Sequence, residues 1–209
     1  MTGMLSLFLV SLSAVFFVVD PFAVVPIFLA MTRNDAPEKI RAMCLRACVV
    51  AGGLLVFFAL FGGLIFKIFG VSLAAFRVAG GVLLLITAID MLKAQPSPTR
   101  TSAVERQEGE VKDDIAIVPL AVPLLSGPGA IATVMVLMSK GEGLLVAVPV
   151  VLSILLTFVV TYYVLRAAGL VQRVLGQSGV AILERIMGLI LAAIAVQFMA
   201  DGGRDLLGR

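Results

Sequence analysis

The chain has 209 residues, of which 61% are hydrophobic and only 14% are charged, and its formal net charge is +3. A soluble globular domain is about half apolar and about a quarter charged, so this composition excludes a soluble fold. It predicts an all-α integral membrane protein, because a helix satisfies its own backbone hydrogen bonds in lipid. We expect the lipid bilayer to be a partner and expect no nucleic-acid partner.

Six apolar segments follow one another along the chain. They comprise residues 5–31, 47–66, 71–91, 115–138, 144–165 and 186–200. The third contains Arg77 and Asp90 near its ends and the sixth is short, whereas the others are long enough to cross a hydrocarbon core of about 30 Å. The N-terminus lacks the basic stretch of a signal peptide, and its apolar run continues past any plausible cleavage site. We therefore expect six transmembrane helices, the first of which stays in the protein.

The basic residues are unevenly divided between the two sides of such a protein. The loops on one side would carry eleven Lys and Arg residues, namely Arg33, Lys39, Arg41, Arg46, Lys93, Arg100, Arg106, Lys112, Arg166, Arg173 and Arg185. The other side would carry five, namely Lys67, Arg77, Lys140, Arg204 and Arg209. By the positive-inside rule the first side is cytoplasmic. The sequence thus predicts a multi-pass membrane protein with both termini outside the cytoplasm.

An internal repeat divides the chain into two similar units. DPFAVVPIFLAMT, which starts at Asp20, aligns with GPGAIATVMVLMS, which starts at Gly127, at an offset of 107 residues. Two further matches lie in the same order, KIFGVS with RVLGQS at an offset of 106 and RVAG with RIMG at an offset of 108. Three spans in each unit reverse its orientation, which predicts two inverted three-helix repeats, an arrangement typical of secondary transporters. The units are residues 1–93 and 115–209, joined by a polar cytoplasmic linker over 94–114.

The first and fourth apolar segments are interrupted at equivalent positions. Asp20 precedes Pro21 in the first, and Gly127 precedes Pro128 in the fourth. Proline breaks a helix interior but suits the first position of a new helix, where Asp is a favoured cap. We therefore expect helices one and four to be discontinuous, each with a second half-helix whose first backbone N–H groups are unpaired and partly positive. Two such starts facing one another near the bilayer midplane would form an anion site.

The residues around these breaks are the candidate substrate-binding residues. They are Asp20, Pro21, Phe22, Ala23, Ser126, Gly127, Pro128, Gly129, Ala130 and Thr133. Asp20 is an ionisable residue at membrane depth, and such residues are functional candidates; it could bind an ammonium group, Na⁺ or a proton, or simply cap its helix. The Thr133 hydroxyl could contact solute or bond back to its own helix. Small lining residues favour a small, neutral solute.

Other notable residues have structural interpretations. Cys44 and Cys48 share a helix face and are expected to be small buried apolar residues, because a thiol–disulfide conduit would need a cysteine in each half. We interpret Pro26, Pro119 and Pro123 as bends. Asp90 and Gln197 are expected at the membrane interface, as are Arg77 and Arg185. The chain has no histidine, no Walker A motif and no GxSxG motif, so we expect neither enzyme activity nor a cofactor or metal centre.

FFVVDPFAVVPIFLAMT in the first segment and PLLSGPGAIATVMVLMS in the fourth resemble the MarC family, which includes the SnatA-type small neutral amino acid transporters. The resemblance covers nearly the whole chain and implies a location in the bacterial inner membrane, with both termini in the periplasm. It implies a proton- or sodium-coupled carrier of glycine, alanine and related amino acids, with Asp20, Pro21 and 127–129 near the solute. Members often carry glycine soon after the Asp-Pro pair, where this chain has Phe22, Ala23 and Val24. The family name records a link with antibiotic resistance, so the alternative is a channel or exporter for another small, drug-related solute.

Overall fold

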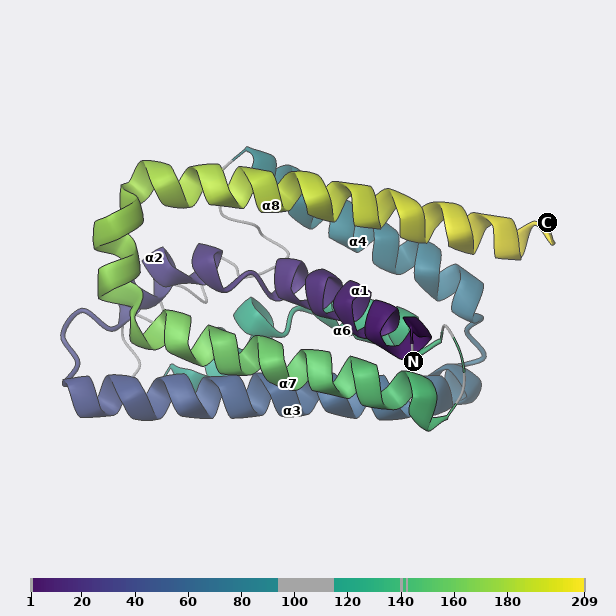
Figure 1. Ribbon diagram of the computed structural model, residues 1–209, viewed down its shortest axis with the longest axis horizontal. Coiled ribbons are helices and arrows are strands. Elements are labelled where there is room, and N and C mark those ends of the chain that lie inside the picture. Colours follow the sequence, from purple (N-terminus) through teal and green to yellow (C-terminus); the bar gives the residue numbers. More distant parts are fainter. Residues whose placement is uncertain (1, 94–114, 140, 142, 209) are drawn as a thin grey trace.

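A computed structural model describes residues 2–93, 115–139, 141 and 143–208, and this part of the chain is built from helices. In chain order the helices are α1 Thr2–Val19, α2 Pro21–Met31, α3 Pro37–Phe69, α4 Leu73–Leu92, η1 Ala116–Leu125, α6 Pro128–Met138, α7 Leu144–Arg166 and α8 Ala168–Leu206. The long helices run roughly alongside one another, and α1 begins at the end of the bundle where α8 finishes (Figure 1). The predicted linker over 94–114 lies outside the described residues.

The expectation of an all-helical membrane protein is confirmed in the described part of the chain. Five helical segments are long and apolar enough to cross a membrane, and the number rises to six if η1 and α6, which meet at an angle of 57°, form one span. Many large apolar side chains on the outer surface remain exposed, such as Val49 at 64% and Leu189 at 65%. Water would penalise such a surface, whereas lipid covers it.

Two helices extend well beyond the apolar segments from which they were predicted. α3 begins at Pro37 rather than near residue 47, and α8 runs from Ala168 to Leu206 rather than over 186–200. An apolar window marks only the part of a helix that lies in hydrocarbon, and polar turns can continue the helix beyond it. Within α8 the helix is interrupted at Gly176, where φ is 62°.

Helices that are far apart in the chain pack against one another. α3 lies against α7, and α4 lies along α8. A Cβ atom at Gly81 of α4 would come within 2.8 Å of the Ala195 carbonyl oxygen of α8, and one at Gly188 of α8 would come within 3.0 Å of the Ala88 oxygen of α4. Glycine at both points lets the two backbones meet, as is common between membrane helices.

Candidate functional site

Asp20 forms the junction between α1 and α2. Its φ of 47° is left-handed, a conformation that Asp adopts more readily than most residues. Its backbone N–H donates to the Phe16 carbonyl at 2.9 Å, and its carboxylate oxygen Oδ1 accepts from the Ala23 N–H at 3.3 Å. The side chain is completely buried. Asp20 is thus the N-cap of α2, with Pro21 at the first helical position, as the sequence predicted.

Gly127 forms the corresponding junction between η1 and α6, but it provides no side-chain cap. Its backbone is extended, and its carbonyl accepts the first helical bond from the Ile131 N–H at 3.1 Å. Pro128 follows and has no N–H, so the next two N–H groups, those of Gly129 and Ala130, have no acceptor within the helix. This start therefore presents unpaired donors where α2 has a carboxylate.

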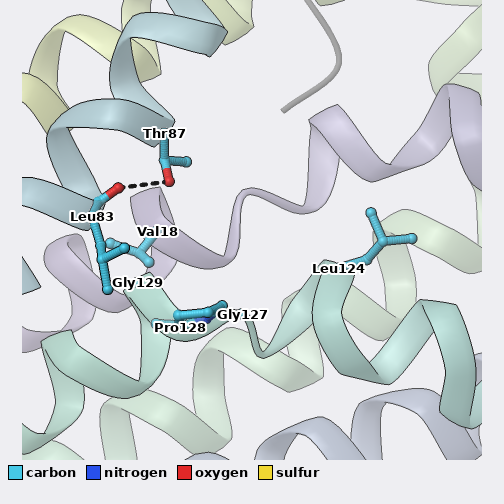
Figure 2. A pocket seen from close by; sticks show the side chains of 8 residues that line it. Val18, Leu83, Thr87, Leu124, Gly127, Pro128 and Gly129 are labelled. Carbon is cyan, nitrogen blue, oxygen red and sulfur yellow. Dashed lines mark hydrogen bonds between the residues drawn. The ribbon is translucent and has the colours of Figure 1, made fainter. Parts of the chain in front are cut away.

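A small cavity of about 20 Å³ lies beside the start of α6. It is lined by Val18, Leu83, Thr87, Leu124, Gly127, Pro128, Gly129 and Ala130. Figure 2 shows the α1 and α4 residues gathered around Gly129, with Leu124 of η1 on the far side of Gly127. A cavity needs about 10–15 Å³ of such volume to hold one water, so it can hold a water-sized group but not an amino acid.

The two junctions come together through complementary contacts. The last turn of α1 contacts the first turn of α6, because a Cβ atom at Gly129 would lie 3.9 Å from the Val18 side chain. The other halves of the two segments, α2 and η1, also contact each other. Of the ten candidate residues, the four over 127–130 line the cavity. Pro21, Phe22 and Ala23 do not line it, and neither does Asp20.

Two candidate hydroxyls bond within their own segments. The buried Ser126 hydroxyl donates to the Ala121 carbonyl at 2.7 Å, and the buried Thr133 hydroxyl donates to the Gly129 carbonyl at 2.8 Å. Thr133 therefore back-bonds to its helix, which is one of the two roles considered from sequence. Phe22 stacks edge-on against Phe16, with ring centroids 6.3 Å apart.

The wall contributed by α4 could not be identified from sequence. Leu83 and Thr87 line the cavity, and Thr87 donates to the Leu83 carbonyl at 3.0 Å (Figure 2). Both sit in an ordinary apolar run, so no local motif marks them. Val18 is different, because its place two residues before the Asp-Pro pair could have pointed to it.

A second, larger cavity of about 490 Å³ lies on the other side of Pro128, between α3, α4, η1 and α6. Its walls are almost entirely apolar, and the hydroxyl-bearing residue among them is Ser126. Leu83 and Pro128 line both this cavity and the small one. These two side chains therefore form the partition between them.

The two junctions differ in exposure although they occupy equivalent positions. Pro21 is buried and Pro128 is exposed. One turn further on, Val24 is 1% exposed, whereas its counterpart Ile131 is half-buried and lines the large cavity. The molecule is thus closed around the first junction and open beside the second.

The other polar residues singled out from sequence line neither of these two cavities. Arg77 pairs with Asp205 and also donates to the Ser139 hydroxyl at 3.1 Å, and Gln197 donates to Asp201 at 2.8 Å. Arg185 is exposed. Over the ranges that the structure covers, no group of three or more His, Cys, Asp or Glu side chains is placed to hold a metal ion.

The two cysteines are buried in α3. Cys44 and Cys48 are both free thiols, completely or almost completely enclosed. Their burial agrees with the interpretation from sequence that both cysteines are small apolar packing residues.

Comparisons with known proteins cover almost the entire chain. Residues 5–207 match the model of the family described as MarC family integral membrane protein. The chain is 41% identical to the UPF0056 membrane protein MJ1677 of Methanocaldococcus jannaschii over 97% of this chain and 98% of the relative. It is 36% identical to a UPF0056 membrane protein of Aquifex aeolicus over 91% and 89%. With YhcE of Escherichia coli it is 30% identical over 90% and 87%.

These relatives come from both bacteria and archaea, and their names state no substrate. No solved structure matches the chain. The family match and the relatives identify the same family that the Asp-Pro and Gly-Pro segments indicated. The chain belongs to the MarC family of integral membrane proteins.

Proposed function

We propose that the protein is a secondary transporter of small neutral amino acids, of the glycine and alanine class, coupled to a proton or sodium gradient. The observation that carries the proposal is the start of α6, which has no side-chain cap and whose first residues line a small cavity. Unpaired donors and a partial positive charge at a helix start favour a carboxylate. A family of integral membrane proteins is consistent with this role.

The buried carboxylate of Asp20 would supply the second half of a zwitterion site. Asp20 caps α2 at the end of α1, and α1 contacts α6. A carboxylate in the membrane interior is costly, so such a residue is a candidate for a functional role. In this role Asp20 contacts the ammonium group or carries the coupling ion. The small cavity is narrower than an amino acid, so in this proposal α4 must move away from α6 before solute can reach the Gly129 and Ala130 N–H groups.

The proposed architecture is a pair of inverted repeats whose first and fourth spans are discontinuous. Helix contacts occur in matching pairs, such as α1 with α7 and η1 with α3, or α2 with α8 and α6 with α4. The contacts Gly81–Ala195 and Gly188–Ala88 exchange under the 107-residue offset. Gly70, which precedes α4, and Gly176 in α8 have φ of 63° and 62°. These correspondences support a pseudo-two-fold axis in the membrane plane.

The unequal exposure of the two junctions supports alternating access. In an inverted repeat, each half can adopt the conformation of the other, which closes one side and opens the opposite side. The open cavity beside Pro128 includes Phe69 and Val71, at the turn between α3 and α4. By the positive-inside assignment that turn faces away from the cytoplasm. The proposed state is therefore outward-facing, in a plasma membrane with both termini outside.

The test is uptake of labelled glycine and alanine into proteoliposomes under an imposed proton or sodium gradient. We expect the wild type to accumulate solute and Asp20→Asn to fall to background, because it retains a capping oxygen but loses the charge. Asp90→Asn is the matched control, since it removes a carboxylate from α4 outside the site, and should retain uptake. Absence of uptake by folded wild type under every gradient would refute the amino acid assignment.

The large apolar cavity favours a second candidate, export of a more apolar small solute. Its walls offer an apolar molecule extensive contact and a zwitterion very little. Counterflow with a panel of amino acids and amphipathic drugs separates the two. Exchange of drugs without exchange of glycine or alanine would favour the exporter.

A further inference from the structure

An open groove runs along the outer surface between α3 and α7. Its volume is about 530 Å³, and its walls extend from Leu45 to Val56 on α3 and from Leu155 to Tyr163 on α7. The two helices lie side by side along one edge of the bundle (Figure 1). Much of the wall is exposed, including Val49 at 64% and Leu155 at 50%. The groove thus opens toward the lipid rather than toward the proposed transport site.

The length of the groove corresponds to one leaflet of a bilayer. At 1.5 Å per residue, the stretch from Leu45 to Val56 covers about 16 Å. The hydrocarbon core is about 30 Å thick, so each leaflet contributes about 15 Å. The groove can therefore hold an acyl chain along most of its length.

Both walls of the groove lead to an arginine at the same end. Arg41 lies one turn before Leu45 on α3, and Arg166 lies one turn after Tyr162 on α7, so each continues the face that lines the groove. Both side chains are exposed, and neither forms an ion pair with another described residue. Tyr162 and Tyr163 lie at this end too, and tyrosine is enriched at the headgroup level.

We propose that this groove is a binding site for an anionic phospholipid. One acyl chain lies between α3 and α7, and the phosphate lies between the Arg41 and Arg166 guanidinium groups. The same end of the bundle holds Arg33, Lys39 and Arg46, which the positive-inside rule assigns to the cytoplasmic face. Anionic lipids are concentrated in that leaflet, so the chemistry of the groove matches the lipid available to it.

One exposed glycine of the groove lining can be replaced by a larger residue without a clash at its Cβ atom. Gly53 lines the groove, and a Cβ atom there would meet no atom within 4 Å. Gly53→Leu would place a side chain where the acyl chain lies and would favour the helix over glycine. Gly63→Leu is the matched control, because Gly63 is also exposed on α3 with nothing within 4 Å and lies outside the groove.

The first experiment measures thermal unfolding of delipidated full-length protein in neutral detergent with phosphatidylglycerol or phosphatidylcholine. We expect phosphatidylglycerol to raise the Tm and phosphatidylcholine to do so much less. At about 1 kcal/mol per basic residue near an anionic lipid, Arg41→Gln with Arg166→Gln should weaken the apparent affinity about thirtyfold. Arg204→Gln, at the opposite end, should have no effect. Equal stabilisation by both lipids, or an unchanged affinity in the double variant, would overturn the proposal.

Native mass spectrometry supplies the second readout. We expect wild type and Gly63→Leu to retain one or more phosphatidylglycerol molecules and Gly53→Leu to retain fewer, while all three unfold at similar temperatures without lipid. A lipid-independent dimer that Gly53→Leu abolishes would show that a second copy of the chain occupies the groove, and would overturn the lipid assignment.

Discussion

The two equivalent helix starts are capped in different ways. Asp20 brings its own carboxylate to the Ala23 N–H, whereas Gly127 has no side chain to offer. A carboxylate at the first start leaves less need for an external anion, while the second start has unpaired donors beside a cavity. In the proposed zwitterion site, the first start would therefore contact the ammonium group and the second would contact the carboxylate.

Gly127 should be intolerant of even a methyl group. Its Cβ would lie 2.9 Å from the Pro123 carbonyl oxygen, a backbone atom that cannot move without displacing η1. We expect Gly127→Ala to lower the free energy of unfolding by about 1–3 kcal/mol, as overpacking usually does. Gly203→Ala, where a Cβ meets nothing within 4 Å, is the control. Equal Tm values of the two variants in detergent would contradict the expectation.

At the scale of the helix, sequence predicted the starts well and their surroundings poorly. The Asp-Pro and Gly-Pro pairs identified where α2 and α6 begin, because capping chemistry is local. The residues of α4 that complete the cavity were missed, since Leu83 and Thr87 approach α6 only through tertiary packing. The non-helical turns at Val118 and Val122 were predictable in kind, because each precedes a proline.

The partition formed by Leu83 should control access to the small cavity. In a background with Cys44 and Cys48 replaced by alanine, Thr87→Cys reports water access through its reaction with a water-soluble thiol reagent. We expect Leu83→Ala to raise that labelling rate several-fold, because it joins the large cavity to the small one. Leu85→Ala, a change on the same helix outside both cavities, should not. Equal rates in the two variants would exclude a partition at Leu83.

At the scale of the whole molecule, the repeat predicts a second conformation in which the first junction is accessible and the second is buried. Ile131 lines the open cavity and its counterpart Val24 is buried. We expect Ile131→Cys to react quickly and Val24→Cys slowly in the resting protein, again without the native cysteines. Transported solute with a gradient should slow the first reaction and accelerate the second. Labelling in vesicles of known orientation measures both, and rates that never change in opposite directions would argue against alternating access.

The order of the helices could be read from sequence because hydropathy and proline are properties of short windows. The charge asymmetry likewise follows from counting. The mutual placement of the halves could not be obtained this way, since it depends on contacts such as Gly81 with Ala195 that join residues far apart in the chain. Which of the two junctions is open also could not be predicted, because both halves have a similar pattern of apolar segments and proline breaks.

The two glycine contacts between α4 and α8 have a mechanical consequence. Two points of backbone contact, at Gly81 and at Gly188, fasten a pair of helices against both sliding and pivoting. α4 therefore cannot leave α6 alone; it must carry α8 with it, and α8 lies against α2. In the proposed transport cycle, withdrawal of this pair from the start of α6 would press α8 against α2, so the two helix starts would not be accessible at the same time.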